Sequence, residues 1–314
     1  MTSTANNHPE EVEQTLIGGT EKAISQPSKT PLYKGINALR YQRQAAIKVI
    51  EESTGRHLIS YVSGINTMID RDDTIGFVDL LHNIPNGEDL DLILHTAGGD
   101  VDAAEKLMTM IRTKVGTATL RVVVPDFAKS AGTLMAIGAD FIVMSDSSEL
   151  GPIDPQIVLA DDRGNRIQHR VQSYLDAYTT HSKTLKGDPT NVVAQMMLSK
   201  LDPATLELFQ GIRLHAIRIA ESQLRQGMFR TNGNWSQTAS ELMSVERWQS
   251  HAEMISWKDA SDPKLQLSIE YLQPTDEIWQ QYWQLYCLQR LAIKANQKLY
   301  ESSYASILMD SEDA

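Results

Sequence analysis

The feature that most constrains this chain is a pair of turns, each of which joins a short apolar run to a helical pattern. The first turn carries Gly98 and Gly99, and the second ends on Ser130. Apolar runs before the turns indicate buried strands, and the spacing of apolar residues after them indicates helices. The strands are predicted over residues 92–94, 120–124 and 141–144, and the helices over 101–115 and 131–139. This alternation predicts an α/β fold of parallel βαβ units, which bind ligands at the carboxyl ends of their strands.

Both turns fall at that end of the predicted sheet, and their residues suit acyl transfer. Consecutive glycines such as Gly98 and Gly99 expose backbone N–H groups to a ligand. A serine at a helix N-terminus, as predicted for Ser130, has its developing charge favoured by the helix dipole. A nucleophile beside an oxyanion hole is the minimum that acyl transfer requires. The alternative is structural: a tight glycine turn, and a serine that caps its helix.

Three segments of the sequence resemble a known family. HTAGGDVDAAEKL, VVVPDFAKSAGTLMAIGADFIVM and SELGPIDPQI are similar to the ClpP-class serine peptidases. The resemblance is greatest to the serine dehydrogenase proteinases, which are relatives of signal peptide peptidase A. It is strong over residues 92–156 and weaker over 40–272. It implies the ClpP/crotonase-like fold, a spiral of βαβ units, to which this chain adds C-terminal helices.

The same resemblance implies roles for the residues of the two turns. The serine that follows the strand is the nucleophile of this superfamily, which corresponds to Ser130. The paired glycines supply oxyanion N–H groups, which correspond to Gly98 and Gly99. Ala131, the residue after the nucleophile, supplies a further N–H group.

The orienting acid is less directly indicated. In the ClpP proteolytic subunit a histidine occupies about the place of Asp154, so this sequence departs from the order Ser, His, Asp. The serine dehydrogenase proteinases have the order Ser, Asp, His, which makes Asp154 the orienting acid. Glu246 falls nearest to the acid of the ClpP order. The alternative is that Asp154, which is flanked by prolines, has no catalytic role and caps a turn.

Three positions are candidates for the general base. His251 resembles the histidine of a recurrent aromatic-x-Ser-His pattern and completes the order Ser, Asp, His. His169 is a second candidate, and Lys183 a third. Archaeal membrane relatives use a Ser-Lys dyad, but this chain has Arg170 about where their lysine lies. Histidine titrates near neutral pH without perturbation, whereas a lysine would need burial to lower its pKa by several units.

Composition excludes several classes of function. The 314-residue chain has a formal net charge of −11, which argues against nucleic acid as a partner, because phosphate binding requires a basic surface. The single cysteine, Cys287, excludes an internal disulfide and suits a reducing cytoplasm. No apolar stretch reaches the length of a membrane span. No P-loop motif is present, so any use of ATP would belong to a partner. We expect neither a cofactor nor a metal.

The sequence divides into three predicted parts. A polar leader over 1–33, with at most a short helix, precedes the peptidase domain over 34–272, and a C-terminal helix and tail occupy 273–314. Further helices are predicted over residues 39–52, 74–82, 166–185, 188–200, 203–226 and 275–302, and further strands over 58–62 and 265–272. The last helix has a broad aromatic face, which either covers the core or packs against another subunit.

Two classes of function follow. The first is a cytoplasmic, homo-oligomeric serine endopeptidase that hydrolyses peptides or unfolded proteins through an acyl-enzyme on Ser130. The second is a crotonase-like acyl-binding module, or an inactive oligomeric scaffold, that keeps the oxyanion turns without proteolysis. Ser130 favours the first class, because crotonase-type enzymes do not require a serine nucleophile at that place.

Overall fold

The computed structural model describes residues 29–160, 164–231 and 233–311. The chain divides into two units, Met1–Leu39 and Arg40–Ala314, of which the structure describes the residues given above. In the first unit, the short helix α1 (Pro31–Ile36) begins with a proline, whose missing N–H group costs nothing in the first turn of a helix. Most of the predicted leader, residues 1–28, lies outside the described residues, and the predicted boundaries at 33 and 272 stay predictions.

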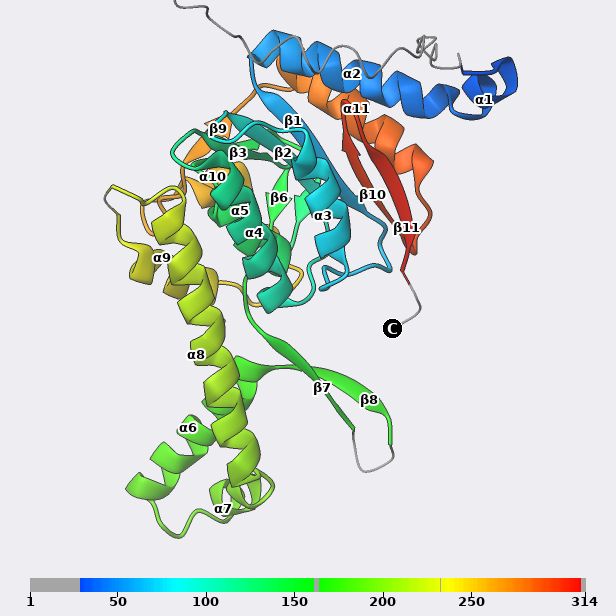
Figure 1. The fold of residues 1–314 in the computed structure, drawn as a ribbon. Coiled ribbons are helices and arrows are strands. Elements are labelled where there is room, and N and C mark those ends of the chain that lie inside the picture. Colours follow the sequence, from blue (N-terminus) through cyan, green and yellow to red (C-terminus); the bar gives the residue numbers. More distant parts are fainter. Residues whose placement is uncertain (1–28, 161–163, 232, 312–314) are drawn as a thin grey trace, which may run out of the picture. The chain divides into compact units, whose positions relative to one another are not determined.

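The second unit is built on a seven-stranded sheet in the order β11-β10-β1-β2-β3-β5-β9 (Figure 1). Its strands are β1 (His57–Ser63), β2 (Leu90–His95), β3 (Leu120–Val123), β5 (Phe141–Met144), β9 (Ile269–Tyr271), β10 (Gln297–Ser302) and β11 (Ser306–Asp310). Neighbouring strands from β1 to β9 are parallel. Strand β10 is antiparallel to β1, and β11 is antiparallel to β10. The predicted α/β fold, with a central and mostly parallel sheet, is confirmed.

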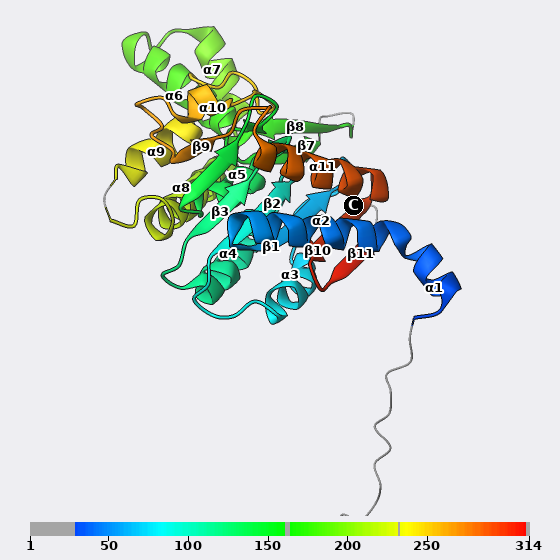
Figure 2. The ribbon, with the colours of Figure 1, turned by 90° about the horizontal axis from the view of Figure 1, so that it is seen from above.

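Helices cover both faces of the sheet because successive strand residues point to opposite faces. On one face, Leu58 of β1 packs in a cluster with α2 (Ala38–Thr54) and α11 (Glu277–Ala292). On the other face, Ile59 belongs to the larger core. Four helices supply much of the helical part of this core (Figure 2). These are α3 (Asp73–His82), α4 (Val101–Val115), α5 (Ala131–Ile137) and the C-terminal half of α8 (Pro203–Gln226).

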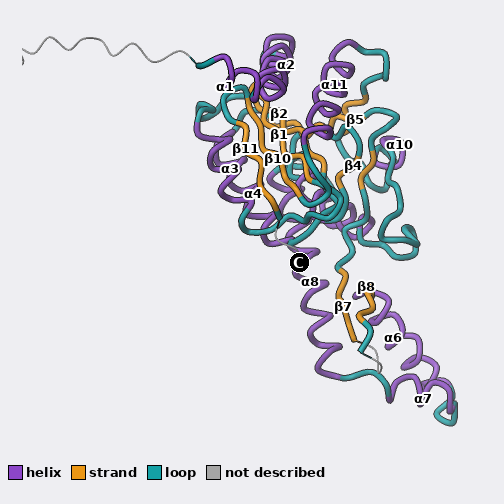
Figure 3. Tube along the Cα trace, turned by 90° about the vertical axis from the view of Figure 1, so that its right-hand side faces the viewer, coloured by secondary structure: helices purple, strands orange, loops and turns teal. Residues whose placement is uncertain are grey.

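Between β6 (Glu149–Leu150) and α8 the chain forms an arm that has its own small core. The hairpin of β7 (Gln156–Ala160) and β8 (Arg166–Arg170) leads into α6 (Val171–Gly187) and α7 (Val192–Ser199). Val171, Leu175, Leu206 and Phe209 are the buried residues of this core. Figure 3 shows the arm at the opposite end of α8 from the central sheet. Helices α9 (Trp235–Leu242) and α10 (Trp257–Ala260) follow α8. Among the described helices, none combines the length and the apolar character needed to cross a membrane.

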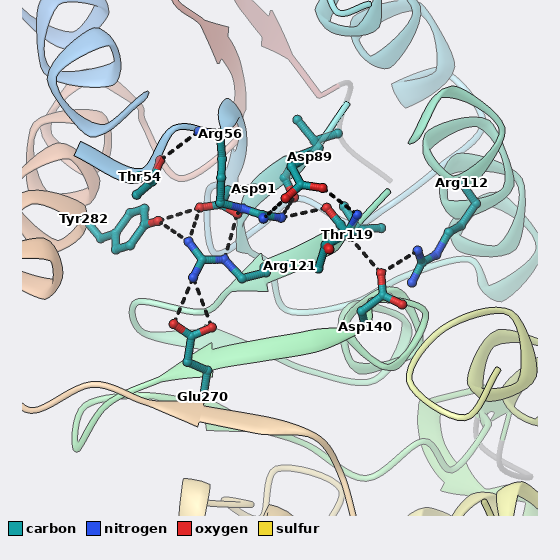
Figure 4. A network of polar contacts seen from close by, with 12 residues as sticks. Thr54, Arg56, Asp89, Asp91, Arg112, Thr119, Arg121, Asp140, Glu270 and Tyr282 are labelled. Carbon is teal, nitrogen blue, oxygen red and sulfur yellow. Dashed lines mark hydrogen bonds and ion pairs between the residues drawn. The ribbon is translucent and has the colours of Figure 1, made fainter. Parts of the chain in front are cut away.

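An ionic network fastens the strands at the end of the sheet opposite the predicted site (Figure 4). Asp91, which is fully buried near the start of β2, accepts hydrogen bonds from Arg56 Nε at 2.6 Å and from Tyr282 Oη at 2.6 Å. Arg121 of β3 donates to both carboxylate oxygens of Asp91 and also pairs with Glu270 of β9. Burial of a carboxylate is costly unless it is paired and hydrogen-bonded, and these donors supply that pairing. This end of the sheet is therefore closed by structural charges.

The C-terminal helix predicted to reach residue 302 ends at Ala292, so that prediction is wrong. Ile293 is extended, and residues 297–302 form β10, whose side chains are all buried. The polar residues of β10 look like the solvent face of a helix in the sequence. In the structure Lys298 pairs with Asp73 at 2.8 Å, and Glu301 pairs with Arg43 at 2.8 Å. Buried ion pairs thus conceal the strand pattern.

The helix predicted over 166–185 begins five residues late, because Arg166–Arg170 is strand β8 and α6 begins at Val171. Strand β8 pairs with residues 156–160, where no strand was predicted. Its sequence, Arg-Ile-Gln-His-Arg, is mostly polar, so it lacks the apolar alternation that identifies a half-buried strand. The other predicted helices and strands occur within a few residues of their expected positions.

Candidate active site

Ser130 lies in a backbone conformation that few residues other than glycine adopt. It follows the short strand β4 (Phe127–Ala128) and precedes α5, with φ 52° and ψ −113°. Non-glycine residues with positive φ are uncommon, and such strain concentrates at functional sites. The Ser130 side chain makes no capping hydrogen bond to α5. Ser130 occupies the N-cap position of α5, but its hydroxyl accepts no hydrogen bond from the N–H groups of that helix.

The Ser130 turn is held by the neighbouring strand end. Thr96, just after β2, donates its N–H to Phe127 O at 3.1 Å and accepts from Lys129 N at 3.0 Å. In the first turn of α5, Thr133 Oγ1 donates to Ala128 O at 2.8 Å. These bonds fix the backbone on both sides of Ser130. The strain at Ser130 is therefore maintained by surrounding structure.

The glycine turn faces Ser130 directly. Gly98 has φ 111°, and a Cβ atom built on it would lie 2.9 Å from Ser130 Cβ. Gly99 has φ 147°, and a Cβ atom there would lie 2.3 Å from Ile69 O. Ile69 forms a parallel bridge with Gly99, through hydrogen bonds to Gly98 O at 2.7 Å and from Asp100 N at 2.8 Å. Both glycines are required by close approach as well as by φ.

Two backbone N–H groups beside Ser130 are available to a ligand. Gly98 N–H donates to Thr96 Oγ1 at 3.2 Å. Within the part of the chain that the structure describes, neither Gly99 N–H nor Ala131 N–H has a protein acceptor. Donors of this kind at a helix start and a glycine turn are what an oxyanion hole requires.

Asp154 and His251 form a hydrogen-bonded pair. His251 Nδ1 lies 2.7 Å from Asp154 Oδ1. Asp154 is buried, with 1% of its side chain exposed, while 26% of the His251 side chain is exposed. A carboxylate at Nδ1 fixes the tautomer of an imidazole and leaves Nε2 for a reacting group. Among the described residues, no side chain bonds to His251 Nε2 or to Ser130 Oγ. Catalytic hydrogen bonds of this type often close only with substrate bound.

Arg170 is the second partner of Asp154. Its Nε donates to Asp154 Oδ2, and its Nη1 donates to Trp248 O at 2.9 Å and to Gln249 O at 3.1 Å. Arg170 therefore fixes the acid and also the chain just before His251. The sequence places Arg170 where relatives carry a dyad lysine, but only the strand geometry of β8 reveals its contact with Asp154.

The segments that carry Asp154 and His251 pair with each other beside α5. Strand β6 (Glu149–Leu150) pairs in parallel with β4, and Leu150 forms an antiparallel bridge with Ile255. Gly151 N donates to Thr133 Oγ1 at 3.1 Å, and Gly151 O lies 2.8 Å from Thr133 Oγ1 as an alternative acceptor for the hydroxyl proton. The candidate acid, the candidate base and Ser130 are therefore carried by three segments that bond to one another.

The other candidates lie elsewhere. His169 precedes Arg170 in β8 and opposes Ile157 across the hairpin, with its side chain exposed. Since successive strand residues point to opposite faces, the side chain of His169 is directed away from Asp154. Lys183 is exposed on α6, and Glu246 is exposed in the loop before His251. Of the three candidate bases, the structure brings only His251 to Asp154.

A further histidine, His95, lies near the site but is closed off. It is buried at the end of β2, with Tyr286 Oη 3.2 Å from its Nδ1 and Phe127 packed on its ring at 4.1 Å. Burial, together with the charge of Arg290, lowers the pKa of His95 to about 3. Tyr286 also donates to Asp126 Oδ2 at 2.7 Å, so this cluster fastens α11 to the strand ends. Among the described residues, no group of three His, Cys, Asp or Glu side chains could hold a metal ion.

Comparison with solved structures gives matches at low sequence identity. A variant of the 1510-N membrane-bound stomatin-specific protease aligns with a TM-score of 0.43 and 14% identity, over 72% of this chain and 84% of that chain. ClpP1 from Listeria monocytogenes aligns with a TM-score of 0.37 and 14% identity, over 74% of this chain and 97% of that chain.

Sequence relatives come from Methanocaldococcus jannaschii. The uncharacterized protein MJ0137 is 33% identical over 130 residues, which are 36% of this chain and 43% of the relative. The uncharacterized protein MJ1495 is 29% identical over 153 residues, which are 45% of this chain and 49% of the relative. The chain thus spans slightly less than half the length of either relative.

The family match covers the glycine turn, the Ser130 turn and Asp154. Residues 31–162 match the family model described as ClpP-like SDH-type serine proteinase. Over residues 31–162, this chain is therefore similar to the ClpP-like SDH-type serine proteinases.

Proposed function

We propose that the chain is a serine endopeptidase that cleaves peptide bonds through an acyl-enzyme on Ser130. The observation that carries this proposal is the Asp154–His251 hydrogen bond, at 2.7 Å, on segments that bond to the strained Ser130 turn. An acyl-binding module of the crotonase type, or an inactive scaffold, needs neither an exposed serine hydroxyl nor an oriented histidine. The pair therefore favours the peptidase over these alternatives.

In the proposed acylation, Ser130 Oγ attacks the peptide carbonyl carbon while His251 Nε2 takes the hydroxyl proton. Asp154 keeps Nδ1 protonated and stabilises the imidazolium that forms. The carbonyl π electrons move to oxygen, and the resulting oxyanion accepts hydrogen bonds from Gly99 N–H and Ala131 N–H. Gly98 is not assigned as a donor to the oxyanion, because its own N–H is already bonded to a threonine side chain.

The tetrahedral intermediate then collapses. The C–N bond breaks, His251 gives its proton to the leaving amine, and an ester on Ser130 remains. Water attacks this ester with His251 as the base, which releases the acid product and restores the serine. Neither a metal nor a cofactor is required by these steps.

We further propose that the substrates are peptides or unfolded proteins and that the chain acts in the cytoplasm as a homo-oligomer. Apolar side chains on α7 support assembly, since Val192 is 63% exposed, Val193 64% and Met196 59%. Exposed apolar patches of this kind mark interaction surfaces. Light scattering should give a mass of at least two chains at micromolar concentration, and a monomer would contradict the assembly alone.

Turnover of a fluorogenic peptide library tests the proposed chemistry. Ser130→Ala and His251→Ala should each reduce kcat by roughly 10⁴-fold or more, and the double variant should be no slower, because such residues act as one unit. His169→Ala is the matched control and should keep wild-type turnover. Loss of turnover in His169→Ala with retention in His251→Ala would reassign the base.

A further inference from the structure

Lys129 is a nearly buried cation beside the candidate nucleophile. It directly precedes Ser130, and 13% of its side chain is exposed. Its Nζ donates to Leu150 O at 3.0 Å and to Glu253 O at 3.3 Å, and it pairs with Glu149 Oε2 at 3.1 Å. The catalytic steps proposed above do not use this side chain. A buried lysine is costly unless it is paired and hydrogen-bonded, and these three acceptors meet that requirement.

We propose that Lys129 is a positioning residue that holds the segments of Asp154 and His251 against the Ser130 turn. This inference rests on the proposed function. The first carbonyl that Lys129 bonds belongs to Leu150, four residues before Asp154. The second belongs to Glu253, two residues after His251. One ammonium group thus joins three segments, each of which carries one member of the proposed triad.

The same contacts argue that Lys129 is not the general base. An ammonium group has three donors and no acceptor. Leu150 O, Glu253 O and Glu149 Oε2 account for all three donors. To act as a base, Lys129 would first have to lose one of these protons, and with it the hydrogen bond that the proton makes. Burial lowers the pKa of Lys129, and the nearby charges of Glu149 and Asp126 oppose that shift.

Gly151 lies directly against the side chain of Lys129. A Cβ atom built on Gly151 would lie 2.6 Å from Lys129 Cδ and 3.4 Å from Lys129 Cα. Gly151 is also the residue that Thr133 bonds at the start of α5. The lysine stem therefore lies flat against a glycine in the segment that leads to Asp154. A side chain at Gly151 would push the stem away without removing its charge.

Positioning has a characteristic kinetic effect. The distance between Ser130 and His251 matters in the transition state, whereas substrate binding depends less on it. Misplacement of reacting groups by about 1 Å can cost on the order of 100-fold in rate. Removal of the Lys129 amine should therefore reduce kcat by roughly 10- to 100-fold with little change in KM.

The test measures peptide turnover by the full chain and its variants over a range of pH. Lys129→Met should lower kcat by that factor, and Lys129→Arg, which keeps charge and donors, should recover part of the loss. The acid limb of kcat/KM should keep its position in Lys129→Met, because Lys129 transfers no proton in the proposed steps. The control is Lys258→Met, which removes an exposed lysine whose Nζ lies over the Trp257 ring and should leave turnover unchanged.

Several outcomes would overturn the inference. Wild-type kcat in a folded Lys129→Met contradicts it, and so does disappearance of the acid limb, which would make Lys129 the base. If Lys129→Met does not fold, Gly151→Ala takes its place, with reduced kcat expected and wild-type kcat contradicting the inference. Equal turnover by the wild type and Ser130→Ala would instead refute the proposed function itself, and the role of Lys129 with it.

Discussion

Replacement of Asp154 by asparagine should separate the catalytic duty of this side chain from its structural duty. Asp154 is 1% exposed and binds two donors, the imidazole of His251 on Oδ1 and the guanidinium of Arg170 on Oδ2. The substitution keeps the shape of the side chain but removes its charge. It also replaces one carboxylate oxygen by an N–H₂ group, which can no longer accept a hydrogen bond.

The size of the effect follows from these two contacts. A hydrogen bond to a charged group contributes about 1.5–3 kcal/mol. If the amide oxygen stays with Arg170, the imidazole of His251 loses its acceptor and its electrostatic partner. At about 1.4 kcal/mol for each factor of ten, kcat should fall roughly 10- to 100-fold. That loss is smaller than the loss expected for Ser130→Ala or His251→Ala, because the base itself remains.

Stability should fall less than it would if the whole side chain of Asp154 were removed. The charge of Arg170 remains, and its Nη1 still bonds Trp248 O at 2.9 Å and Gln249 O at 3.1 Å. Removal of one partner from a buried ion pair costs about 3–5 kcal/mol, but an isosteric amide that still accepts from the guanidinium should cost only about 1–3 kcal/mol. Thermal unfolding followed by circular dichroism gives this number independently of activity.

The assay compares kcat, KM and Tm for the wild type, Asp154→Asn, and a control carboxylate in the same region. Asp146→Asn suits the control, because Asp146 accepts from Trp257 Nε1 at 3.1 Å and from Tyr271 Oη at 3.0 Å, away from Asp154 and His251 in the hydrogen-bond network of the described residues. A folded Asp154→Asn with kcat within about three-fold of the wild type would refute the reasoning, since about 0.6 kcal/mol is less than one such bond contributes. Loss of activity in Asp146→Asn would show that the assay reports general damage.

Three further perturbations test other parts of the structure. Gly99→Val should both inactivate and destabilise, by about 2–5 kcal/mol in urea unfolding, because its Cβ would lie 2.3 Å from Ile69 O at φ 147°; unchanged stability would contradict the close packing of this turn. Since His95 has its pKa lowered to about 3 by burial, unfolded chains bind a proton there first as pH falls below about 6.5. Stability should therefore fall by up to about 1.4 kcal/mol per pH unit from pH 6.5 towards 3 on account of this group, and His95→Gln should show a shallower loss; identical slopes would refute the assignment. Asp91→Ala should lower the free energy of unfolding by about 3–5 kcal/mol, because it leaves Arg121 without its buried partner; wild-type stability would show that the network is dispensable.

The central βαβ units could be predicted from the sequence because their signals are local. The apolar runs of β2 and β3, and the amphipathic spacing of α4, depend only on neighbouring residues. The two turns could also be placed together, because parallel strands bring their carboxyl ends to one edge of the sheet. The contact itself, with Gly98 packed on Ser130, needed the coordinates.

The parts that could not be predicted depend on partners far along the chain. Strand β10 reads as a polar helix until Lys298 is paired with Asp73, and Glu301 with Arg43. Strand β8 has no apolar alternation, so its hairpin with β7 and the approach of Arg170 to Asp154 leave no pattern. The preference for His251 over His169 also rests on that strand, because the direction of a side chain depends on the register. The role of Lys129 could not be predicted from the sequence, because its acceptors include backbone carbonyls of other segments.

The measurement that tests the central claim most directly is the site of covalent labelling by a fluorophosphonate probe. The account predicts one adduct, which peptide mass spectrometry maps to Ser130, with no adduct on Ser130→Ala and slow labelling of His251→Ala. The strained turn and the N–H groups of Gly99 and Ala131 are the structural reasons for this selectivity. Labelling of another residue, or equal labelling of the wild type and Ser130→Ala, would contradict the assignment of Ser130 as the nucleophile.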